Sequence, residues 1–400
     1  MAETMNMMSV TIEDFTSEVE AQLEEENYDP MIGIGKSGVG KTMSLYELTQ
    51  KLGIGFCELR LVTLTEVDLL GIPTITPEGT TTYASNDLLP RVDRDGEKGI
   101  LVLDEITSAT STIRAAAYQL LDSKRALGNY KLPKHWKVVA LGNGIDDGGV
   151  FQGMEHAFLS RAVCYRIDPD LDVWKKWAVN NGVNPSIPAF LTFDNAWFHK
   201  MDTDEMASIF PCPRSWVALS KMLNAREKRK KRVLTETEVT MLAAGAVGVE
   251  AATPFATFYR FNDDVKLTPE QILSGEAVKE SGSVGSRVFK STVPVSSLEQ
   301  QTIYITIQSV TKALTEQLKN FSYSLPEAER KKHLKSVVNV MKWAMAMGEE
   351  RVDYAISTIQ DISNSIECFS LMILDEDLGF DELLPEFLGF AAKHSIVFNE

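Results

Sequence analysis

The sequence predicts an α/β fold with a parallel sheet, followed by a small helical lid and a further, mostly helical C-terminal region. Short apolar runs alternate with helical stretches from Met31 to Pro169, and parallel strands need crossovers of this length. One apolar run leads into the Gly-rich stretch GKSGVGKT at 35–42, which opens a helix. From Leu171 onward the pattern is predominantly helical.

The elements follow in order along the chain. An acidic amphipathic helix is expected over 11–25, ending at the turn-prone residues 27–30. The core strands are expected at 31–34, 57–63, 100–104, 137–141 and 162–167, and the core helices near 41–52, 66–70, 111–124 and 152–159. Further helices are expected over 171–232, 235–258 and 299–395, with a Gly/Ser-rich loop or extended segment at 274–298.

A chain of 400 residues is longer than one compact core usually holds, so two or three domains are expected. We divide it into an N-terminal acidic helix (1–29), an α/β core (30–169), a helical lid (170–260) and a C-terminal partner or assembly region (261–400).

Composition and charge bound the class of protein. Apolar residues make up 44% and charged residues 24%, as in ordinary globular proteins, and no apolar run is long enough for a membrane span. The N-terminus is acidic, unlike a signal peptide. Four scattered cysteines indicate reduced thiols in a cytosol, and the scattered histidines predict no structural transition metal.

The net charge of −16 weighs against a protein whose main task is binding nucleic acid, because such proteins present a basic face. A local basic run, residues 226–232 (REKRKKR), leaves that possibility open. The alternative is that this run is simply the solvated end of a helix and its following turn.

GKSGVGKT matches the phosphate-binding pattern G-x-x-x-x-G-K-[ST] in full, and the alternative is a chance Gly-rich turn. Its glycines let successive N–H groups point at phosphate oxygens, with the helix dipole adding to the attraction. The expected nucleotide-binding residues are Gly35, Ser37, Gly38, Val39, Gly40, Lys41 and Thr42. Lys41 would bridge the β- and γ-phosphates, and Thr42 would offer its hydroxyl to Mg²⁺.

A buried strand, Ile100–Leu103, ends in the acidic pair Asp104 and Glu105. Ligands of open α/β sheets bind at this end of the strands. Asp104 would hold Mg²⁺ through water, and Glu105 would polarise the attacking water. The alternative is an ordinary strand that ends in surface acids.

A further strand ends at Asn143, whose amide could reach between the water and the γ-phosphate. On local sequence alone, an asparagine before Gly144 equally fits a structural turn.

In order, the chain gives GKSGVGKT, ILVLDE, the strand ending in Asn143, Leu159-Ser160-Arg161 and Pro213-Arg214-Ser215. This order and spacing resemble an AAA+ ATPase. With residues 67–71 (VDLLG), they resemble more narrowly the MoxR family and its phage and bacterial relatives in the helix-2-insert branch. The resemblance covers residues 31 to 225 well and 235–260 weakly.

The resemblance implies roles residue by residue. Lys41 and Thr42 belong to Walker A, Asp104 and Glu105 to Walker B, and Asn143 to sensor 1. Arg161 takes the place of the arginine finger and Arg214 that of sensor 2. A finger acting in trans implies a ring, most simply a hexamer, with ATP between subunits. The alternative for Arg161 is a surface or salt-bridging side chain. For Arg214 it is an ordinary residue of a helix start, because Pro-Arg-Ser-Trp is a short motif.

Two segments resemble the family's inserts: residues 71–83 as the helix-2 insert and 128–133 as the hairpin before sensor 1. In the family such hairpins meet partners or substrate; the alternative is an exposed hairpin without a partner. Two positions depart from the family pattern: Lys36-Ser37 replaces a common Pro-Pro, and Ala162 replaces a Phe after the finger.

Three functions follow as hypotheses. The first is a MoxR-like ATPase in a bacterial or phage-infected host cytosol that remodels a protein partner, by family habit one with a von Willebrand A domain. The second is an AAA+ motor or loader on nucleic acid. The third is a scaffold whose nucleotide only sets assembly. The acidic charge favours the first over the second, and the full set of Lys41, Asp104, Glu105 and a finger favours hydrolysis over the third. ATP rather than GTP is a family inference.

Overall fold

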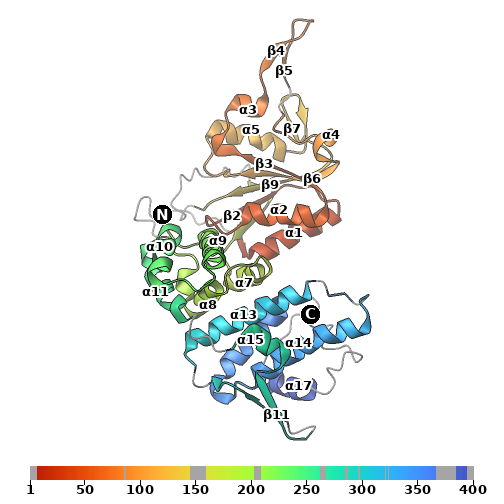
Figure 1. Cartoon of the computed structure of the whole chain (residues 1–400). Coiled ribbons are helices and arrows are strands. Elements are labelled where there is room, and N and C mark those ends of the chain that lie inside the picture. Colours follow the sequence, from red (N-terminus) through yellow and green to blue (C-terminus); the bar gives the residue numbers. More distant parts are fainter. Residues whose placement is uncertain are drawn as a thin grey trace. The chain divides into compact units, whose positions relative to one another are not determined.

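The computed structural model describes residues 7–84, 87–144, 159–201, 209–261, 267–283, 287–295, 298–319, 321–322, 324–365 and 384–393. The chain forms two compact units (Figure 1). Unit 1 comprises Met1–Asp170, Met201–Ala207 and Cys212–Arg214, and unit 2 comprises Leu171–Lys200, Ser208–Pro211 and Ser215–Glu400. No helix in the described ranges combines the length and the apolar character needed to cross a membrane.

Unit 1 is built on a six-stranded sheet in the order β1-β10-β2-β9-β6-β3, and every pairing is parallel. Its strands are β1 (Met8–Val10), β2 (Met31–Gly35), β3 (Gly55–Arg60), β6 (Lys98–Asp104), β9 (His135–Gly142) and β10 (Val163–Ile167). The predicted α/β class with a parallel sheet is confirmed. The expected strand 57–63 is wrong at its C-terminal end, because residues 61–63 form a 3-10 turn, η1 (Leu61–Thr63).

The sheet has an edge strand that the sequence did not predict. Residues 1–29 were expected to supply only a helix, but β1 pairs with β10, with Met8 opposite Tyr165 and Val10 opposite Ile167. Thr11 then caps α1 (Ile12–Glu24), in which Asp14 completes a capping box. The strand has only three residues, too few to show a periodic pattern.

Helices cover both faces of the sheet (Figure 1). On one face α1 and α2 (Lys41–Leu52) share a hydrophobic core with Ile100 and Val102 of β6. On the other face α3 (Glu66–Leu70) and α5 (Ser111–Leu121) meet Leu101 and Leu103 of the same strand. Because alternate residues of a strand point to opposite faces, an unbroken apolar run such as 100–103 must be buried on both sides.

Two antiparallel hairpins and a short helix complete unit 1: β4 (Pro73–Ile75) with β5 (Thr81–Tyr83), β7 (Ala126–Leu127) with β8 (Tyr130–Lys131), and α4 (Val92–Asp95). Hairpins were expected in both places. The β4–β5 hairpin extends away from the sheet of this unit (Figure 1). The expected helix 152–159 lies almost entirely outside the described residues.

Unit 2 is mostly helical. Its helices are α7 (Leu171–Asn180), α8 (Ser186–Phe193), α9 (Pro213–Lys230), α10 (Glu236–Val247), α11 (Val249–Tyr259), α12 (Pro269–Ser274), α13 (Gln300–Leu318), α14 (Glu327–Met345), α15 (Val352–Ser365) and α17 (Leu384–Lys393), with 3-10 turns η3 (Asn195–Trp197) and η6 (Glu349–Arg351). Gly248, at φ 89°, divides the expected helix 235–258 into α10 and α11. The expected loop or extended segment at 274–298 contains an antiparallel hairpin, β11 (Val278–Ser281) with β12 (Val288–Ser291).

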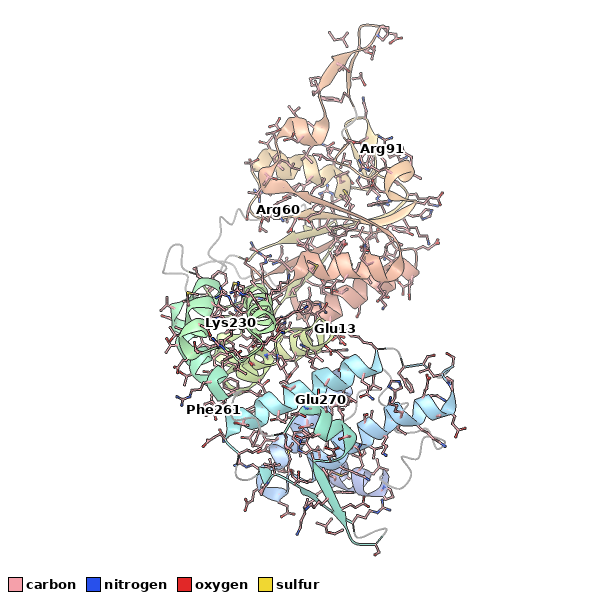
Figure 2. All side chains as sticks on the ribbon, in the orientation of Figure 1. Glu13, Arg60, Arg91, Lys230, Phe261 and Glu270 are labelled. Carbon is pink, nitrogen blue, oxygen red and sulfur yellow. The ribbon has the colours of Figure 1, made fainter. Side chains whose placement is uncertain are left out.

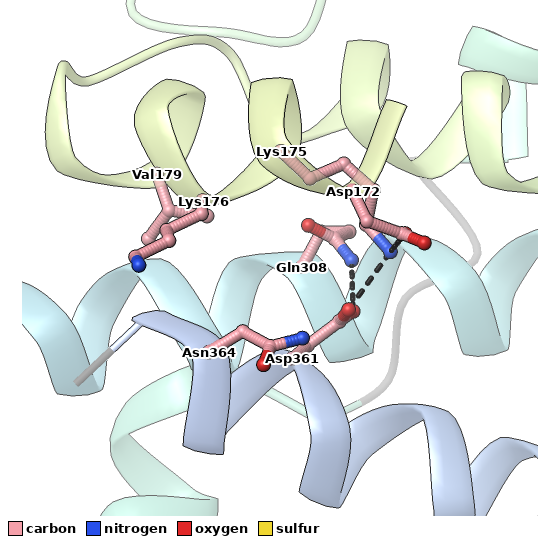
Figure 3. Close-up of a pocket in the computed structure, with 7 residues that line it drawn as sticks. All are labelled: Asp172, Lys175, Lys176, Val179, Gln308, Asp361 and Asn364. Carbon is pink, nitrogen blue, oxygen red and sulfur yellow. Dashed lines mark hydrogen bonds and ion pairs between the residues drawn. The ribbon is translucent and has the colours of Figure 1, made fainter. Parts of the chain in front are cut away.

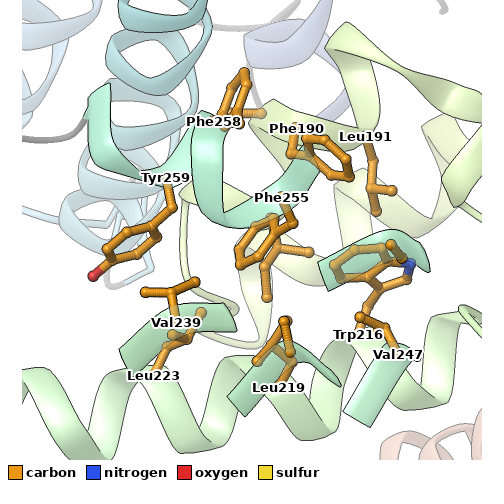
Figure 4. Packing of buried hydrophobic residues seen from close by; sticks show 14 of the residues in the cluster. Phe190, Leu191, Trp216, Leu219, Leu223, Val239, Val247, Phe255, Phe258 and Tyr259 are labelled. Atoms are coloured by element: carbon orange, nitrogen blue, oxygen red, sulfur yellow. The ribbon is translucent and has the colours of Figure 1, made fainter. Parts of the chain in front are cut away.

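The core around α9 is aromatic (Figure 4). Trp216 of α9 contacts Phe190 of α8 and Phe255 of α11, with ring centroids 5.8 and 5.5 Å apart. Ile305 of α13 joins this same cluster. Helices 171–260 therefore pack directly on the C-terminal helices, and residue 260 lies inside one compact unit.

Candidate functional site

The P-loop connects the end of β2 to the start of α2. Gly38 and Gly40 have φ values of +78° and +100°, a backbone region that side chains disfavour, so glycine fits both positions. Gly35 is required for a different reason: a Cβ there would lie 2.1 Å from the carbonyl oxygen of Ile167 on β10. The glycines thus let the loop curl and let β2 approach its neighbour.

Lys41 lies over this loop with its side chain buried. Its Nζ donates hydrogen bonds to the carbonyls of Gly35 (2.6 Å) and Lys36 (2.9 Å) and to Oδ1 of Asn143 (3.1 Å). An ammonium has three donors, and three oxygens surround it. The structure therefore brings Asn143 to Lys41, although the two are 102 positions apart.

Thr42 and Asp104 form the second contact of the site. Thr42 Oγ1 donates a 2.8 Å hydrogen bond to Asp104 Oδ2. A hydroxyl and a carboxylate oxygen are hard oxygen ligands of the kind that Mg²⁺ prefers. The pair therefore fits the expected metal, which Thr42 and Asp104 would hold together with phosphate oxygens of a nucleotide.

Glu105 follows Asp104 in a left-handed backbone conformation, with φ 57°. A non-glycine residue rarely adopts this conformation, and such strain is concentrated at functional sites. Its N–H donates to Asp104 Oδ1 (2.8 Å), and its carbonyl accepts from the N–H of Ser108 (3.0 Å). These bonds turn the chain sharply after β6 and hold Glu105 beside Asp104.

Thr107 is a residue of this site that sequence reasoning missed. Its Oγ1 accepts a 3.0 Å hydrogen bond from the N–H of Asn143, and its side chain is buried. The neighbouring bond from Ile106 N–H to the Leu141 carbonyl (3.0 Å) also ties the end of β6 to the end of β9. Nothing in the local sequence marks Thr107, because its partner comes from a strand 36 positions later.

The two arginines differ in where the structure places them. Arg214, the second residue of α9, donates its backbone N–H to the Gly38 carbonyl (3.0 Å), which brings it to the P-loop within unit 1. Arg161 is exposed in the turn just before β10. The helix expected to precede it, 152–159, lies outside the described residues except for Leu159.

The two hairpins of unit 1 contact each other. Asn129 donates its side-chain amide to the Tyr83 carbonyl (3.2 Å) and to the Thr82 hydroxyl. Tyr130 donates to the Pro90 carbonyl (2.7 Å), and burial raises the pKa of its hydroxyl. Ile75 on β4 is 80% exposed, a large apolar side chain left open to solvent.

In the basic run 226–232, salt bridges are formed at the C-terminal end. Lys230, labelled in Figure 2, and Arg232 both pair with Glu238. These pairs hold the pKa of Glu238 well below its usual range. Lys228 and Arg229 are exposed, and no carboxylate within the described ranges forms a salt bridge with them.

A small polar pocket lies inside unit 2 (Figure 3). Lys175 of α7 forms a 2.8 Å ion pair with Asp361 of α15, and Gln308 of α13 donates to the same carboxylate (2.6 Å). Burial raises the pKa of Asp361, and its two partners only partly offset that effect. These contacts link α7, α13 and α15, and no residue that lines the pocket belongs to the P-loop.

A parallel sheet with a P-loop after one strand and an acidic pair after another defines an α/β P-loop AAA+ fold. Residues 30–162 match the model of the AAA domain (dynein-related subfamily), which supports a general AAA+ ATPase. No curated protein matches the chain.

Among solved structures, one similar chain is that of closed-state Hsp104 with ATPγS and FITC-casein. It is 18% identical with a TM-score of 0.33, and the match covers 44% of this chain and 36% of the Hsp104 chain. Another is a candidate ATPase from Cytophaga hutchinsonii ATCC 33406, 12% identical with a TM-score of 0.28, covering 88% of this chain and 92% of that one. The class of the protein rests on the family match and the fold.

Proposed function

We propose that this protein is a MoxR-like AAA+ ATPase that hydrolyses ATP between the subunits of a ring, most simply a hexamer, to remodel a protein partner. The observation that carries the proposal is the joining of three distant segments at the P-loop. Thr42 contacts Asp104, and Lys41 contacts Asn143. These are the residues that a nucleotide site of this class needs.

Each residue has a role in the proposed reaction. The loop amides and Lys41 bind the β- and γ-phosphates. Thr42 and Asp104 would hold Mg²⁺, which would supply charge neutralisation at the phosphates. Glu105 accepts a proton from the attacking water, and Asn143 orients that water against the γ-phosphate. The leaving group is ADP, and the water oxygen forms the new bond to phosphorus. Arg214 and a neighbour's Arg161 would stabilise charge on the phosphates.

The test of hydrolysis is Glu105→Gln in the full chain. This variant should bind ATP with near wild-type affinity while turnover falls by roughly 100-fold or more, because general base catalysis contributes that much. Turnover at the wild-type rate would remove Glu105 from the proposed mechanism. Lys41→Ala is the matched control, since it should lose binding as well as turnover.

The test of the ring uses two inactive variants in one mixture. Arg161→Ala subunits keep Glu105, and Glu105→Gln subunits keep Arg161. If Arg161 acts in trans, mixing them creates interfaces that hold both groups and restores part of the activity. No recovery at any mixing ratio, with mixed rings demonstrated by mass, would contradict a trans-acting arginine.

The rest of the chain has proposed assignments as well. Residues 1–29 would be the N-terminal acidic segment, 30–169 the ATPase core, 170–260 the lid, and 261–400 a partner or assembly region. A partner with a von Willebrand A domain and a cytosolic location complete the proposal. The exposed Ile75 on the hairpin offers a contact for a protein partner. A pull-down with the Glu105→Gln variant tests this: a protein that is recovered with ATP and not without nucleotide supports it.

A second candidate, action on nucleic acid, is favoured by one face of α9. Residues that recur at helical spacing on that face are exposed and are either basic or alanine: Ala218, Lys221, Ala225, Lys228 and Arg229. Phosphates bind such a face without needing apolar contacts. Its large side chains are all cationic, unlike the core of a typical protein–protein interface.

Binding of a labelled single-stranded oligonucleotide at several salt concentrations separates the two candidates. The triple variant Lys221→Glu/Lys228→Glu/Arg229→Glu should abolish binding if α9 holds the phosphates. The control Lys279→Glu/Lys332→Glu/Lys335→Glu changes the net charge equally at exposed positions elsewhere. Equal losses in both variants, or no binding by the wild type, would leave the protein-remodelling function as the better account.

A further inference from the structure

The segment Cys212–Arg214 lies directly against the P-loop. Cys212 is only 6% exposed, and a Cβ built on Gly38 would come within 2.6 Å of its Sγ and 3.3 Å of its Cβ. The thiol therefore fills the space beside Gly38 that any other residue at position 38 would occupy. Cys212, Arg214 and the P-loop all belong to unit 1.

The hydrogen bond from Arg214 to Gly38 fixes the direction of a peptide group. The peptide bonds in the described ranges are all trans, so the Gly38 carbonyl and the Val39 N–H point in opposite directions. Because the carbonyl faces the Arg214 N–H at 3.0 Å, the Val39 N–H is turned away from Arg214. That amide belongs to the row, Ser37 to Thr42, that would face the phosphates.

Cys212 is presented by a stiff stretch of chain. Prolines on both sides of it have a restricted φ, and Pro213 opens helix α9. The Pro211 carbonyl accepts from the N–H of Lys200 (3.0 Å), and Ser215 Oγ donates to the Phe210 carbonyl (3.2 Å). The sulfur therefore has little freedom to move aside.

We propose that Cys212 and the backbone N–H of Arg214 are positioning groups for the nucleotide site. They hold the Gly38–Val39 peptide in its phosphate-binding orientation, so the affinity for a nucleoside triphosphate depends on how this segment sits on the loop. By reciprocity, bound nucleotide stabilises the segment and the start of α9. This inference rests on the proposed function of the P-loop. In it, Cys212 positions the loop but does not itself contact the nucleotide.

The decisive experiment measures binding of a fluorescent ATP analogue to the full chain carrying Gly38→Ala, with and without Cys212→Ala. The added methyl overlaps the sulfur and occupies a left-handed backbone position, so Gly38→Ala should weaken binding by roughly 10- to 100-fold. Removing the sulfur should restore a large part of that loss, because the nearest remaining atom is then the Cβ of residue 212.

Gly40 supplies the matched control. It has a similar left-handed conformation, φ +100°, but no atom lies within 4 Å of a Cβ built on it. Gly40→Ala should weaken binding through backbone strain, and Cys212→Ala should not improve it. Equal improvement of both glycine variants would contradict a specific contact between positions 38 and 212.

The single variant Cys212→Ala should act in the opposite direction, weakening ATP binding because the loop loses its support. The expected pattern is a raised KM with kcat preserved at saturating ATP, and near wild-type KM in Cys212→Ser, which keeps the shape. The comparison of Cys212→Ala with Cys212→Ser tests the positioning role of Cys212 even if Gly38→Ala fails to fold.

Two outcomes separate the inference from the function on which it rests. A wild-type chain that binds no ATP overturns the proposed function and the inference together. A wild-type chain that binds ATP, with Cys212→Ala neutral and no rescue of Gly38→Ala, overturns the inference alone.

Discussion

The hydroxyl of Thr42 lies 2.8 Å from Oδ2 of Asp104, although 62 positions separate the two residues. Thr42 stands in the first turn of α2, and Asp104 ends β6, which is separated from β2 by β9 in the sheet. The parallel sheet thus delivers a hydroxyl and a carboxylate to one point beside the P-loop. Two oxygens gathered in this way are suited to a divalent cation.

Thr42→Ala should raise the Mg²⁺ concentration needed for half-maximal ATP turnover. Losing a hydrogen bond to a charged group typically costs about 1.5–3 kcal/mol, which corresponds to roughly a 10- to 100-fold shift. Thr42→Ser keeps the hydroxyl and should behave as the wild type. A Mg²⁺ titration of the steady-state rate measures the shift, and an unchanged titration for Thr42→Ala would separate Thr42 from the cation.

Thr107→Val should lower kcat without weakening ATP binding. The valine keeps the shape but cannot accept the hydrogen bond from the Asn143 N–H, so the amide beside Lys41 is left loosely placed. We expect kcat to fall by roughly 10-fold. The fall should be smaller than for Asn143→Ala, because the Asn143 side chain is still present, although misplaced. Thr107→Ser should restore the rate. Equal activity of all three position-107 proteins would show that Asn143 needs no such support.

Lys175→Met should destabilise unit 2, because it leaves the buried carboxylate of Asp361 without its cation. Breaking a buried ion pair by removing one partner typically costs about 3–5 kcal/mol. The double variant Lys175→Met/Asp361→Leu should recover most of that loss. Lys331→Met breaks an exposed pair with Glu327 and should cost less than about 1 kcal/mol. Denaturant unfolding of these proteins and of the single variant Asp361→Leu gives the comparison, and additive losses in the double variant would contradict a coupled pair.

Lys137 should make the stability of unit 1 depend on pH in the alkaline range. Burial lowers the pKa of its ammonium to about 8, although Nζ donates to Gln22 Oε1 (2.7 Å) and to the carbonyls of Asp29 (2.7 Å) and Asn27 (3.2 Å). Between pH 8 and 10.5 the unfolded chain keeps this proton and the folded chain loses it. The contribution of Lys137 to stability therefore rises with pH across that window.

The measurement compares the wild type with Lys137→Met, so that other titrating groups cancel. The difference in unfolding free energy should move in favour of the wild type by on the order of 1–3 kcal/mol between pH 8 and 10.5. A difference that stays constant across this range would contradict a lowered pKa for Lys137.

Much of unit 1 could be predicted from sequence because its signals are local. A Gly-rich loop between a strand and a helix is contained in eight residues, and the apolar run before Asp104 is contained in four. Their meeting follows from one rule, that parallel strands deliver their ends to the same edge. Thr107 and Cys212 could not be predicted, because each acts on a residue far away in the chain, Asn143 and Gly38 respectively.

The features that the sequence left open or missed lacked a local pattern. The β11–β12 hairpin lies in a Gly/Ser-rich stretch whose composition suits loops equally well. Gly248 ends one helix and caps the next through a positive φ, and an isolated glycine in an Ala-rich stretch does not reveal that break. The roles of the Arg161 and Arg214 side chains remain predictions from motif order.

The short strand β1 has a consequence for how the protein is made. Ser9 donates a hydrogen bond to Asp168, which is 159 positions later in the chain. The strand β1 therefore cannot join the sheet until that distant stretch has left the ribosome. At typical synthesis rates the first strand waits roughly 10–30 seconds for its partner. During that time β2 also lacks one of its two neighbouring strands, because β10 lies between β1 and β2 in the sheet. The nascent chain therefore carries unpaired strands through most of the synthesis of unit 1, which is when chaperones would be of most use to it.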